Sequence, residues 1–243
     1  MENKYDNLAF FAKYSQMKRS QEGLEGAGEW ETLRSVLPAF SQKTVLDLGC
    51  GYGWHCLYAY HHGAKAVLGI DSSQRMLEVA KKKAAGLPIV YRQMAMEDIQ
   101  FAAKQFDIIL SSLAIHYIKD IKPLFQGIYD CLADDGIFVF SVEHPVYTAH
   151  GSQDFIYDEA GHIQHFPVDR YFDEGIRHAN FLQEDVIKYH RTLTTYLTTL
   201  LQTGFILEAV MEPQPSQALL EQPGMKDELR RPMMLIVRAR KGK

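Results

Sequence analysis

The feature of this sequence that most constrains its fold is a regular alternation of short apolar runs with longer stretches of helical character. Five apolar runs predict strands at Thr44–Leu48, Ala66–Ile70, Ile89–Gln93, Phe106–Ser111 and Ile137–Val142. The stretches between them predict helices at Trp54–His62, Ser73–Ala85 and Ile121–Leu132. Strands that alternate with helices form βαβ units, so the pattern predicts a parallel sheet with right-handed crossovers.

The alternation stops after Val142 and returns near the C-terminus. Residues 143–190 are aromatic and polar without a clear period, and a long irregular segment inside a domain is usually a functional loop. We therefore expect this segment to fold over a substrate as a lid. A helix at Thr192–Gln202 and strands at Phe205–Met211 and Met233–Ala239 follow it.

The N-terminal part precedes the first strand and reads as two helices, at Asn7–Gln21 and Glu29–Leu37, separated by a glycine-rich stretch. Taken together, these segments predict a single domain over 1–243. Its expected parts are an N-terminal helical cap (1–40), a ligand-binding core (44–142), a lid insertion after the fifth strand (143–190) and the C-terminal part of the sheet (191–243).

The loop after the first strand carries glycines at Gly49, Gly51 and Gly53 and runs directly into a helix. Glycines there permit positive φ and let the backbone approach a ligand, and the following helix N-terminus offers unpaired N–H groups. The dinucleotide fingerprint is GxGxxG, whereas here the sixth position is Trp54. A bulky indole fits poorly with a pyrophosphate and suits a nucleoside ligand without phosphates.

An acidic residue, Asp71, closes the second strand about 20 residues after the glycine loop, where a carboxylate binds ribose hydroxyls. An acid at a strand end also serves as an N-cap of the next helix. Ser72 and Ser73 offer that cap instead, which leaves Asp71 for a ligand. The two motifs together predict a nucleoside site at the carboxyl edge of the sheet.

Five successive motifs, VLDLGCGYG, GIDSS, AMEDI, FDIILSSLAIHYI and LADDGIFVFSVEHP, resemble those of the class I S-adenosylmethionine-dependent methyltransferases in order and spacing. The segments KYHRTL and RRPMMLIVRAR resemble a bacterial branch of that family that acts on small molecules. The resemblance implies an α/β fold, a Rossmann-like seven-stranded sheet, mostly parallel, with helices on both faces and the last strand antiparallel. It also implies S-adenosyl-L-methionine as the cofactor.

The resemblance further implies a cofactor-binding role for individual residues. Asp47 and the three glycines would surround the methionine moiety, and Asp71 would hold the ribose. The remaining candidates would line the adenine or the sulfonium: Ser72, Met76, Met96, Glu97, Ser111 and Leu113. Ala95 departs from the family pattern, since many relatives carry an acid there that accepts from the adenine amine.

Methyl transfer from a sulfonium relies mainly on positioning, and a base is needed only if the acceptor must lose a proton. We therefore expect no metal site and no catalytic triad. His116 and His144 follow the fourth and fifth strands and are the candidate catalytic residues, because histidine takes up a proton near neutral pH.

Further candidates line the expected substrate site and the N-terminal side of the cofactor. Glu143, Tyr147, Tyr171 and His190 are the candidate substrate-binding residues. Tyr14 and Arg19 would close the cofactor site from the N-terminal helix. Arg19 either pairs with the cofactor carboxylate or lies on a solvated helix face, as exposed arginines usually do.

The composition limits the class of partner. A net charge of −4 gives no general attraction to nucleic acid, and no apolar run is long enough for a membrane span. Three cysteines without a CxxC pair suggest a reduced, cytoplasmic setting. We expect a small-molecule substrate and no nucleic-acid or membrane partner; the chain is either a monomer or a homodimer.

Two other functions fit the same motifs less well. An NAD(P)-dependent oxidoreductase shares the glycine loop and the acid, but Trp54 argues against it. A non-catalytic S-adenosylmethionine-binding module would not need the long His-rich segment.

Overall fold

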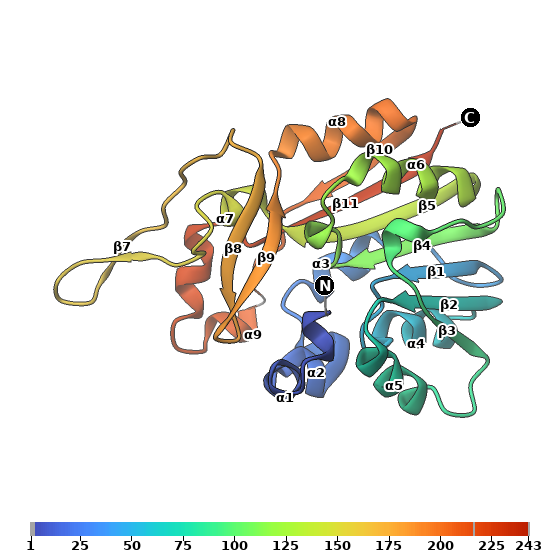
Figure 1. The fold of residues 1–243 in the computed structure, drawn as a ribbon, viewed down its shortest axis with the longest axis horizontal. Helices are drawn as coiled ribbons and strands as arrows, with labels where there is room; N and C mark the ends of the chain where they lie inside the picture. The colour runs from blue at the N-terminus through green and yellow to red at the C-terminus, as the bar shows by residue number, and fades with distance from the viewer. Residues whose placement is uncertain (1–2, 216, 243) are drawn as a thin grey trace.

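A seven-stranded sheet forms the centre of the computed structural model, which describes residues 3–215 and 217–242 (Figure 1). Met1, Glu2, Ser216 and Lys243 of the expected domain ranges lie outside the described residues. The strand order is β10-β11-β5-β4-β1-β2-β3. The strands are β1 (Thr44–Leu48), β2 (Ala66–Asp71), β3 (Ile89–Gln93), β4 (Phe106–Ser112), β5 (Leu132–Glu143), β10 (Phe205–Met211) and β11 (Met234–Lys241).

Only β11 runs against the other strands of this sheet. It pairs antiparallel with both β5 and β10, whereas β1, β2, β3, β4 and β5 pair in parallel. The last strand along the chain is therefore the antiparallel one, and it lies between two others. The expected mixed sheet of a Rossmann-like fold is confirmed.

One predicted boundary is wrong. The fifth strand was expected to begin at Ile137, but β5 already begins at Leu132. Residues 134–136 lie inside the strand as an irregularity, with Asp135 at φ +58°. The added residues keep pairing because Phe106 of β4 faces Leu132.

Helices cover both faces of the sheet (Figure 1). Helices α6 (Ile121–Cys131) and α8 (Leu193–Thr203) pack on one face, where Phe125 and Phe138 are fully buried. Helices α3 (Trp30–Val36), α4 (Trp54–His61) and α5 (Gln74–Lys83) pack on the other face. None of the helices in the described ranges has both the length and the apolar character that a bilayer crossing requires.

Short helices connect the strands at the ligand-binding edge and build the N-terminal part. They are η3 (Met96–Asp98), η4 (Ile115–Tyr117), η1 (Lys4–Asp6), α1 (Leu8–Ser15), α2 (Lys18–Glu22) and η2 (Gly23–Gly26). The predicted N-terminal helix over 7–21 is therefore two helices, with the break at Gln16 and Met17. Met17 has extended backbone and acts as the N-cap of α2, which ends the first helix.

The segment after β5 contains regular structure that was not expected. It holds α7 (Pro145–Thr148) and two antiparallel ribbons, β6 (Ile156–Tyr157) with β7 (Ile163–His165), and β8 (Gly175–Phe181) with β9 (Glu184–His190). The β8–β9 hairpin lies beside the N-terminal helices (Figure 1), where Phe181 packs on Phe10 at 6.0 Å between ring centroids. Helices α9 (Gln217–Leu220) and η5 (Met225–Arg230) precede the last strand.

Candidate functional site

The glycine loop between β1 and α4 has three left-handed glycines, and they differ in what surrounds them. Gly49, Gly51 and Gly53 have φ values of +70°, +52° and +74°. A Cβ added at Gly49 would lie 2.6 Å from the Ala114 Cβ, and one at Gly53 would lie 2.3 Å from the Tyr91 hydroxyl. A Cβ added at Gly51 would meet no heavy atom within 4 Å. The outer glycines are thus needed for packing, whereas Gly51 faces open space that a ligand could fill.

Trp54, which follows the loop, packs against the N-terminal segment. An added Cβ at Gly23 would lie 2.9 Å from its indole. The Lys83 ammonium lies over the indole ring, 4.0 Å from its centroid. The indole therefore anchors the N-terminal segment to α4 and α5.

Asp71 connects the end of β2 to the glycine loop. Its Oδ2 accepts a hydrogen bond from the Gly51 N–H at 2.9 Å, and its Oδ1 accepts from the Ser73 N–H at 2.8 Å. Ser73 is the N-cap of α5, as predicted, because its Oγ accepts from the Met76 N–H. Although Ser73 provides the cap, both carboxylate oxygens of Asp71 already accept hydrogen bonds from the backbone. Each oxygen keeps a further lone pair that could accept from a hydroxyl group of a ligand. Burial raises the pKa of Asp71.

Asp47 is a second carboxylate beside the loop and is only 1% exposed. The Cys56 thiol donates to its Oδ2 at 3.3 Å, while Oδ1 has no hydrogen-bond partner among the described residues. Burial, with a smaller contribution from the charge of Asp71, raises the pKa of Asp47 to about 7. A buried acceptor without a partner costs free energy, so a ligand that donates to Oδ1 would be stabilised there.

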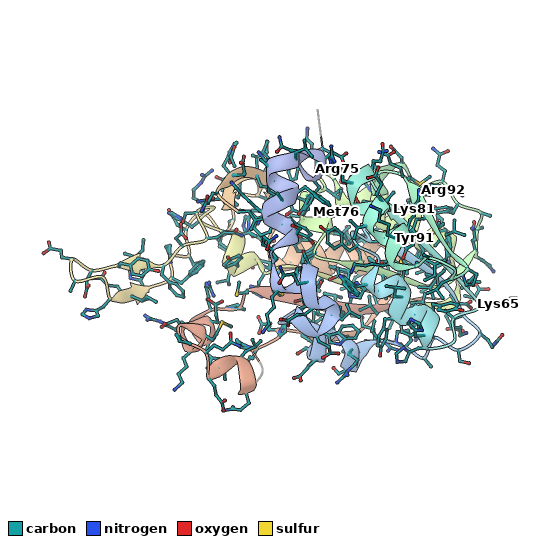
Figure 2. The ribbon with its side chains drawn as sticks, turned by 90° about the horizontal axis from the view of Figure 1, so that it is seen from below. Lys65, Arg75, Met76, Lys81, Tyr91 and Arg92 are labelled. Atoms are coloured by element: carbon teal, nitrogen blue, oxygen red, sulfur yellow. The ribbon has the colours of Figure 1, made fainter. Side chains whose placement is uncertain are left out.

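Of the four candidate adenine residues, two are buried and two are exposed. Met76 and Met96 are buried, and the Met96 methyl carbon would be 3.0 Å from a Cβ at Gly49. Figure 2 shows Met76 on α5 beside the N-terminal helices. Ser72 is exposed, and its hydroxyl accepts from the Asn3 amide at 2.7 Å. Glu97 is exposed to solvent.

The candidates at the end of β4 are Ser111 and Leu113. The Ser111 hydroxyl is buried and donates to the Leu48 carbonyl at 2.9 Å, so it fixes β4 to β1. Leu113 has a left-handed backbone at φ +51°, and its N–H donates to the Ser141 carbonyl at 2.9 Å. A left-handed residue that is not glycine is strained by about 1–2 kcal/mol. This turn brings η4 across the edge of the sheet.

The N-terminal segment lies against the end of β2. The Asp6 carboxylate accepts from the Ser73 hydroxyl at 2.7 Å and from the Arg75 N–H at 3.1 Å. Figure 2 shows Arg75 beside this segment. The Tyr14 ring packs edge-to-face on Tyr5 at 5.4 Å, and the charge of Asp71 helps to raise the pKa of Tyr14 after burial. The Tyr14 ring also packs edge-to-face on Tyr52 of the glycine loop, at 5.7 Å between ring centroids.

Arg19 does not lie on a solvated helix face, which corrects one of the two interpretations of this residue. Its Nη2 donates to the two oxygens of Glu29 at 2.8 and 2.7 Å. The side chains are 22% and 2% exposed. Because Glu29 is buried, Arg19 is held to it as the partner that neutralises its charge.

His116 lies over the end of the sheet and is buried. Its Nδ1 accepts from the Glu143 N–H at 3.3 Å, so the neutral ring carries its proton on Nε2. Burial lowers the pKa of His116 to about 4. At neutral pH the ring is therefore a hydrogen-bond donor and not a proton acceptor, unlike the base that the sequence predicted.

His144 has a structural partner on each side of its ring. Its Nδ1 accepts from the Val146 N–H at 3.0 Å, which caps α7, and its Nε2 lies 2.9 Å from Glu212 Oε1. Burial lowers the pKa of His144. These contacts assign it to the junction of β5 with α7.

Glu143 is part of a buried ion pair. It accepts from the Lys188 ammonium at 2.6 Å and from the Gln153 amide at 2.7 Å. Burial raises its pKa, but His116 and Lys188 outweigh burial, so the net pKa is lowered. Sequence reasoning missed Lys188, because a lysine in a polar stretch gives no sign that the fold buries it.

The other candidate substrate residues make internal contacts. The Tyr147 ring stacks on Phe166 at 5.8 Å. The Tyr171 hydroxyl accepts from the Leu193 N–H at 3.0 Å. His190 pairs through Nδ1 with the Thr148 hydroxyl at 2.7 Å and through Nε2 with the Tyr171 carbonyl at 2.9 Å. Tyr171 and His190 thus hold the insertion to α7 and α8.

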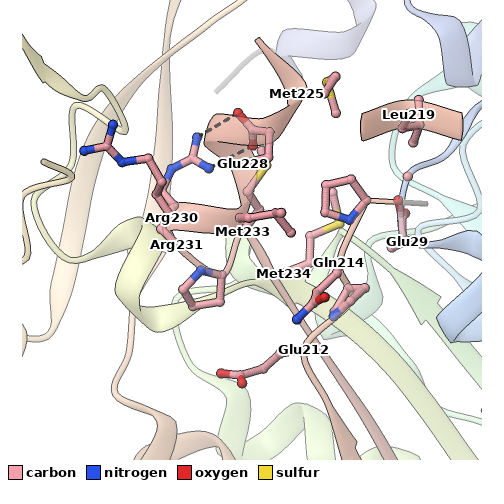
Figure 3. A pocket seen from close by; sticks show the side chains of 15 residues that line it. Glu29, Glu212, Gln214, Leu219, Met225, Glu228, Arg230, Arg231, Met233 and Met234 are labelled. Atoms are coloured by element: carbon pink, nitrogen blue, oxygen red, sulfur yellow. Dashed lines mark hydrogen bonds and ion pairs between the residues drawn. The ribbon is translucent and has the colours of Figure 1, made fainter. Parts of the chain in front are cut away.

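A cavity of about 410 Å³ opens at the same edge of the sheet, beside the end of β10 and the start of β11 (Figure 3). Its walls come from three parts of the chain: residues 28–29, residues 212–215 with 219, and residue 225 with 228–234. Sequence reasoning did not predict it. The signal was the group of methionines at Met225, Met233 and Met234, which stands out from the polar residues around it.

The carboxyl edge of the sheet thus carries two features: open space at Gly51 flanked by two carboxylates, and the cavity beside β11. The family described as "Methyltransferase domain" matches residues 46–140, which include the glycine loop and Asp71.

Two solved structures resemble nearly the whole chain. A candidate S-adenosylmethionine-dependent methyltransferase from Listeria monocytogenes is 54% identical, with a TM-score of 0.87; the match covers 91% of this chain and 100% of that one. An S-adenosylmethionine-dependent methyltransferase from Mesorhizobium loti is 40% identical, with a TM-score of 0.84; the match covers 90% and 100%. An uncharacterised protein of Haemophilus influenzae is 33% identical over 98% of this chain and 96% of its own length.

Proposed function

The chain belongs to the S-adenosylmethionine-dependent methyltransferases, and we propose that it transfers the methyl group to a small molecule by in-line displacement. Its cofactor is S-adenosyl-L-methionine. The observation that carries the proposal is the open space at Gly51, whose N–H is bound by the Asp71 carboxylate. The cavity beside β11 supports a small acceptor, because its volume is that of a small-molecule site.

The residues around Gly51 fit the chemical groups of this cofactor. Asp71 keeps lone pairs that would accept the two ribose hydroxyls. The unpartnered Oδ1 of Asp47 would accept from the ammonium of the methionine moiety. Met76 and Met96 would provide apolar walls for the adenine, and Tyr14 would close the site from the N-terminal side.

When bound, the cofactor would supply a methyl group on a positively charged sulfur for displacement by a lone pair of the acceptor, with the electron pair of the broken carbon–sulfur bond left on sulfur. The chain contributes orientation and exclusion of water. The aromatic rings of Tyr5, Tyr14, Tyr52 and Tyr117 pack on one another above Asp71 and would keep water out.

His116 would act in this reaction as a donor from Nε2, because its Nδ1 accepts from the backbone. A donor at the end of β4 orients an acceptor through an oxygen or nitrogen lone pair. Glu143, held by Lys188, and Tyr147 remain candidates for contact with the acceptor. The insertion over 143–190 keeps its proposed role as a lid, since its hairpin lies beside the N-terminal helices at this edge (Figure 1).

The oxidoreductase alternative falls away because the close relatives belong to S-adenosylmethionine-dependent methyltransferases. A non-catalytic binding module is less well supported than an enzyme, because it would have no use for the cavity. We place the protein in the cytoplasm, which the three free cysteines, Cys50, Cys56 and Cys131, support.

The test is a calorimetric titration with S-adenosylmethionine of the wild type and of Asp71→Ala. We expect the substitution to weaken binding about tenfold to hundredfold, because two hydrogen bonds to a charged group are lost. Asp134→Ala is the matched control, since that acid is exposed and pairs with Lys104 far from the loop. A wild type that binds NAD(H) but not S-adenosylmethionine would overturn the proposal. A screen with labelled methyl donor then identifies the acceptor.

A further inference from the structure

The cavity beside β11 continues the edge that carries the glycine loop. Its floor includes Met234, which pairs in register with Glu143 at the end of β5. The Met233 carbonyl accepts from the His144 N–H at 2.9 Å. Glu29 in its wall is bound to Arg19 of the N-terminal helices. The cavity therefore lies at the same edge of the sheet as the glycine loop and touches the N-terminal part of the chain.

Most of the cavity wall is apolar. The apolar side chains are Met225, Met233, Met234, Leu219, Leu229, Pro213, Pro215 and Pro232. Methionine side chains adapt their shape and make favourable contacts with aromatic rings. A volume of about 410 Å³ lies within the range of small-molecule sites. The wall therefore suits an apolar body, aromatic or aliphatic.

Two of the three acids in the wall already have a cationic partner. Glu29 accepts from Arg19 at 2.7 Å. Glu228 accepts from Arg231 at 2.8 Å, as Figure 3 shows. Arg231 is in addition surrounded by the rings of Tyr147, Phe155 and Phe166 at 4.9, 4.6 and 4.9 Å. Its guanidinium is therefore committed to the insertion and to Glu228.

Arg230, the other cation in the wall, is also engaged. Its guanidinium donates to the carbonyls of Ile163 and Gln164 at 3.2 and 2.6 Å and lies 3.6 Å from Asp227. The wall thus offers an anionic ligand no uncommitted guanidinium among its described residues.

Glu212 differs from the other acids. It is 59% exposed, and its neighbour is His144 Nε2 at 2.9 Å. Because His144 Nδ1 accepts from the Val146 N–H, the ring carries one proton and does not cancel the carboxylate charge; burial also lowers the pKa of His144. Among the described residues of the wall, Glu212 is therefore the carboxylate without a cationic partner. Figure 3 shows it across the cavity from Met225 and Leu219.

We propose that this cavity is the acceptor site and that it takes a small molecule with an apolar body and a cationic amine, the amine facing Glu212. This inference rests on the proposed methyl transfer. The apolar walls hold the body, and the single unpaired carboxylate selects the charge of its polar end. Carboxylate-bearing molecules of the same shape are disfavoured, because they would face Glu212 without a counter-charge.

The test compares three probes of matched shape: 2-phenylethylamine, 2-phenylethanol and 3-phenylpropionate. Binding is measured by ligand-observed NMR at millimolar probe concentration and low ionic strength, with S-adenosylmethionine present. We expect the amine to bind about threefold to fivefold more tightly than the alcohol, since Glu212 is partly screened by solvent. Glu212→Gln should remove that preference. Glu221→Gln, an exposed acid of the same segment outside the cavity, should keep it.

A second variant tests the location. Met225→Trp places a larger ring in the cavity, so all probes should lose affinity while S-adenosylmethionine still binds. Calorimetry with S-adenosylmethionine on each preparation separates the two hypotheses. Three results would overturn the cavity inference alone, provided that the cofactor still binds. They are no binding of any probe, tighter binding of the acid than of the amine, and an amine preference that survives Glu212→Gln. Loss of cofactor binding in the wild type would instead overturn the proposed function.

Discussion

Replacing Gly51 by alanine tests separately the two reasons for a glycine at this position, which are its positive φ and the space left for a bound cofactor. Gly51 has φ +52°, so any other residue there is strained. Unlike Gly49 and Gly53, it has no heavy atom within 4 Å of an added Cβ. The free protein therefore has room for the methyl group of alanine, whereas a bound cofactor would compete for the same space.

The expected magnitudes follow from this geometry. A left-handed alanine costs about 1–2 kcal/mol in the free energy of unfolding. For a domain of this size that lowers Tm by about 2–8 °C. A methyl group forced into a filled site costs a further 1–3 kcal/mol, roughly, so cofactor affinity should fall about fivefold to hundredfold.

The assay pairs thermal unfolding with calorimetric titration of S-adenosylmethionine. Gly86→Ala is the matched control, because Gly86 has φ +81° and also has no heavy atom within 4 Å of an added Cβ. Gly86 follows α5 and precedes β3, and therefore lies at the opposite edge of the sheet. Both variants should lose similar stability, and only Gly51→Ala should lose affinity.

Two results would refute the reasoning. If Gly51→Ala binds the cofactor as tightly as the wild type, the open space at Gly51 is not where the cofactor lies. If Gly86→Ala loses affinity to the same extent, the loss reports general destabilisation and not contact with the cofactor.

Two further predictions concern buried charges. Burial raises the pKa of Asp47 from 3.8 to about 7, so the folded protein holds a proton that the unfolded chain has lost; the contribution of Asp47 to stability therefore falls as pH rises from about 4 to about 7. Asp47→Asn should remove this pH-dependent contribution. The free energy of unfolding of the variant should therefore increase relative to that of the wild type as pH rises to about 7. A difference that does not change with pH would contradict the prediction. Arg19→Met should cost about 3 kcal/mol in urea unfolding, because it leaves the buried Glu29 without its counter-charge. The exposed Arg34→Met is its control, and an equal effect of the two would contradict the buried pair.

The strands of the sheet could be predicted because their signal is local. The bounds predicted for β1, β3 and β10 are those of the structure. Each is a short run whose neighbours contain glycine, proline or charged residues. These boundaries lie next to the strand along the chain, so they identify it even for β3 and β10, which lie at the edges of the sheet and are mostly not buried.

The β8–β9 hairpin was missed because its inward face is polar. Arg177 and Ala179 of β8 and Lys188 and His190 of β9 are buried, while the residues between them are exposed or half-buried. Buried and more exposed residues alternate along both strands, but hydrophobic and polar residues do not alternate in the same way. Arg177 is buried because its guanidinium donates to the carbonyls of Ala149 and Asp173, contacts that no local pattern contains.

The sequence by itself determined the order of strands and helices, the glycine loop and the acid at the end of β2, because these depend on backbone freedom and on residues adjacent along the chain. The tertiary structure decided which charged and titratable side chains are paired within the protein. It paired Arg19 with Glu29 and Lys188 with Glu143, turned His116 into a donor, and left Glu212 without a cation. Electrostatic pairing acts over a few ångströms in space and not along the chain, so these assignments follow only from the fold.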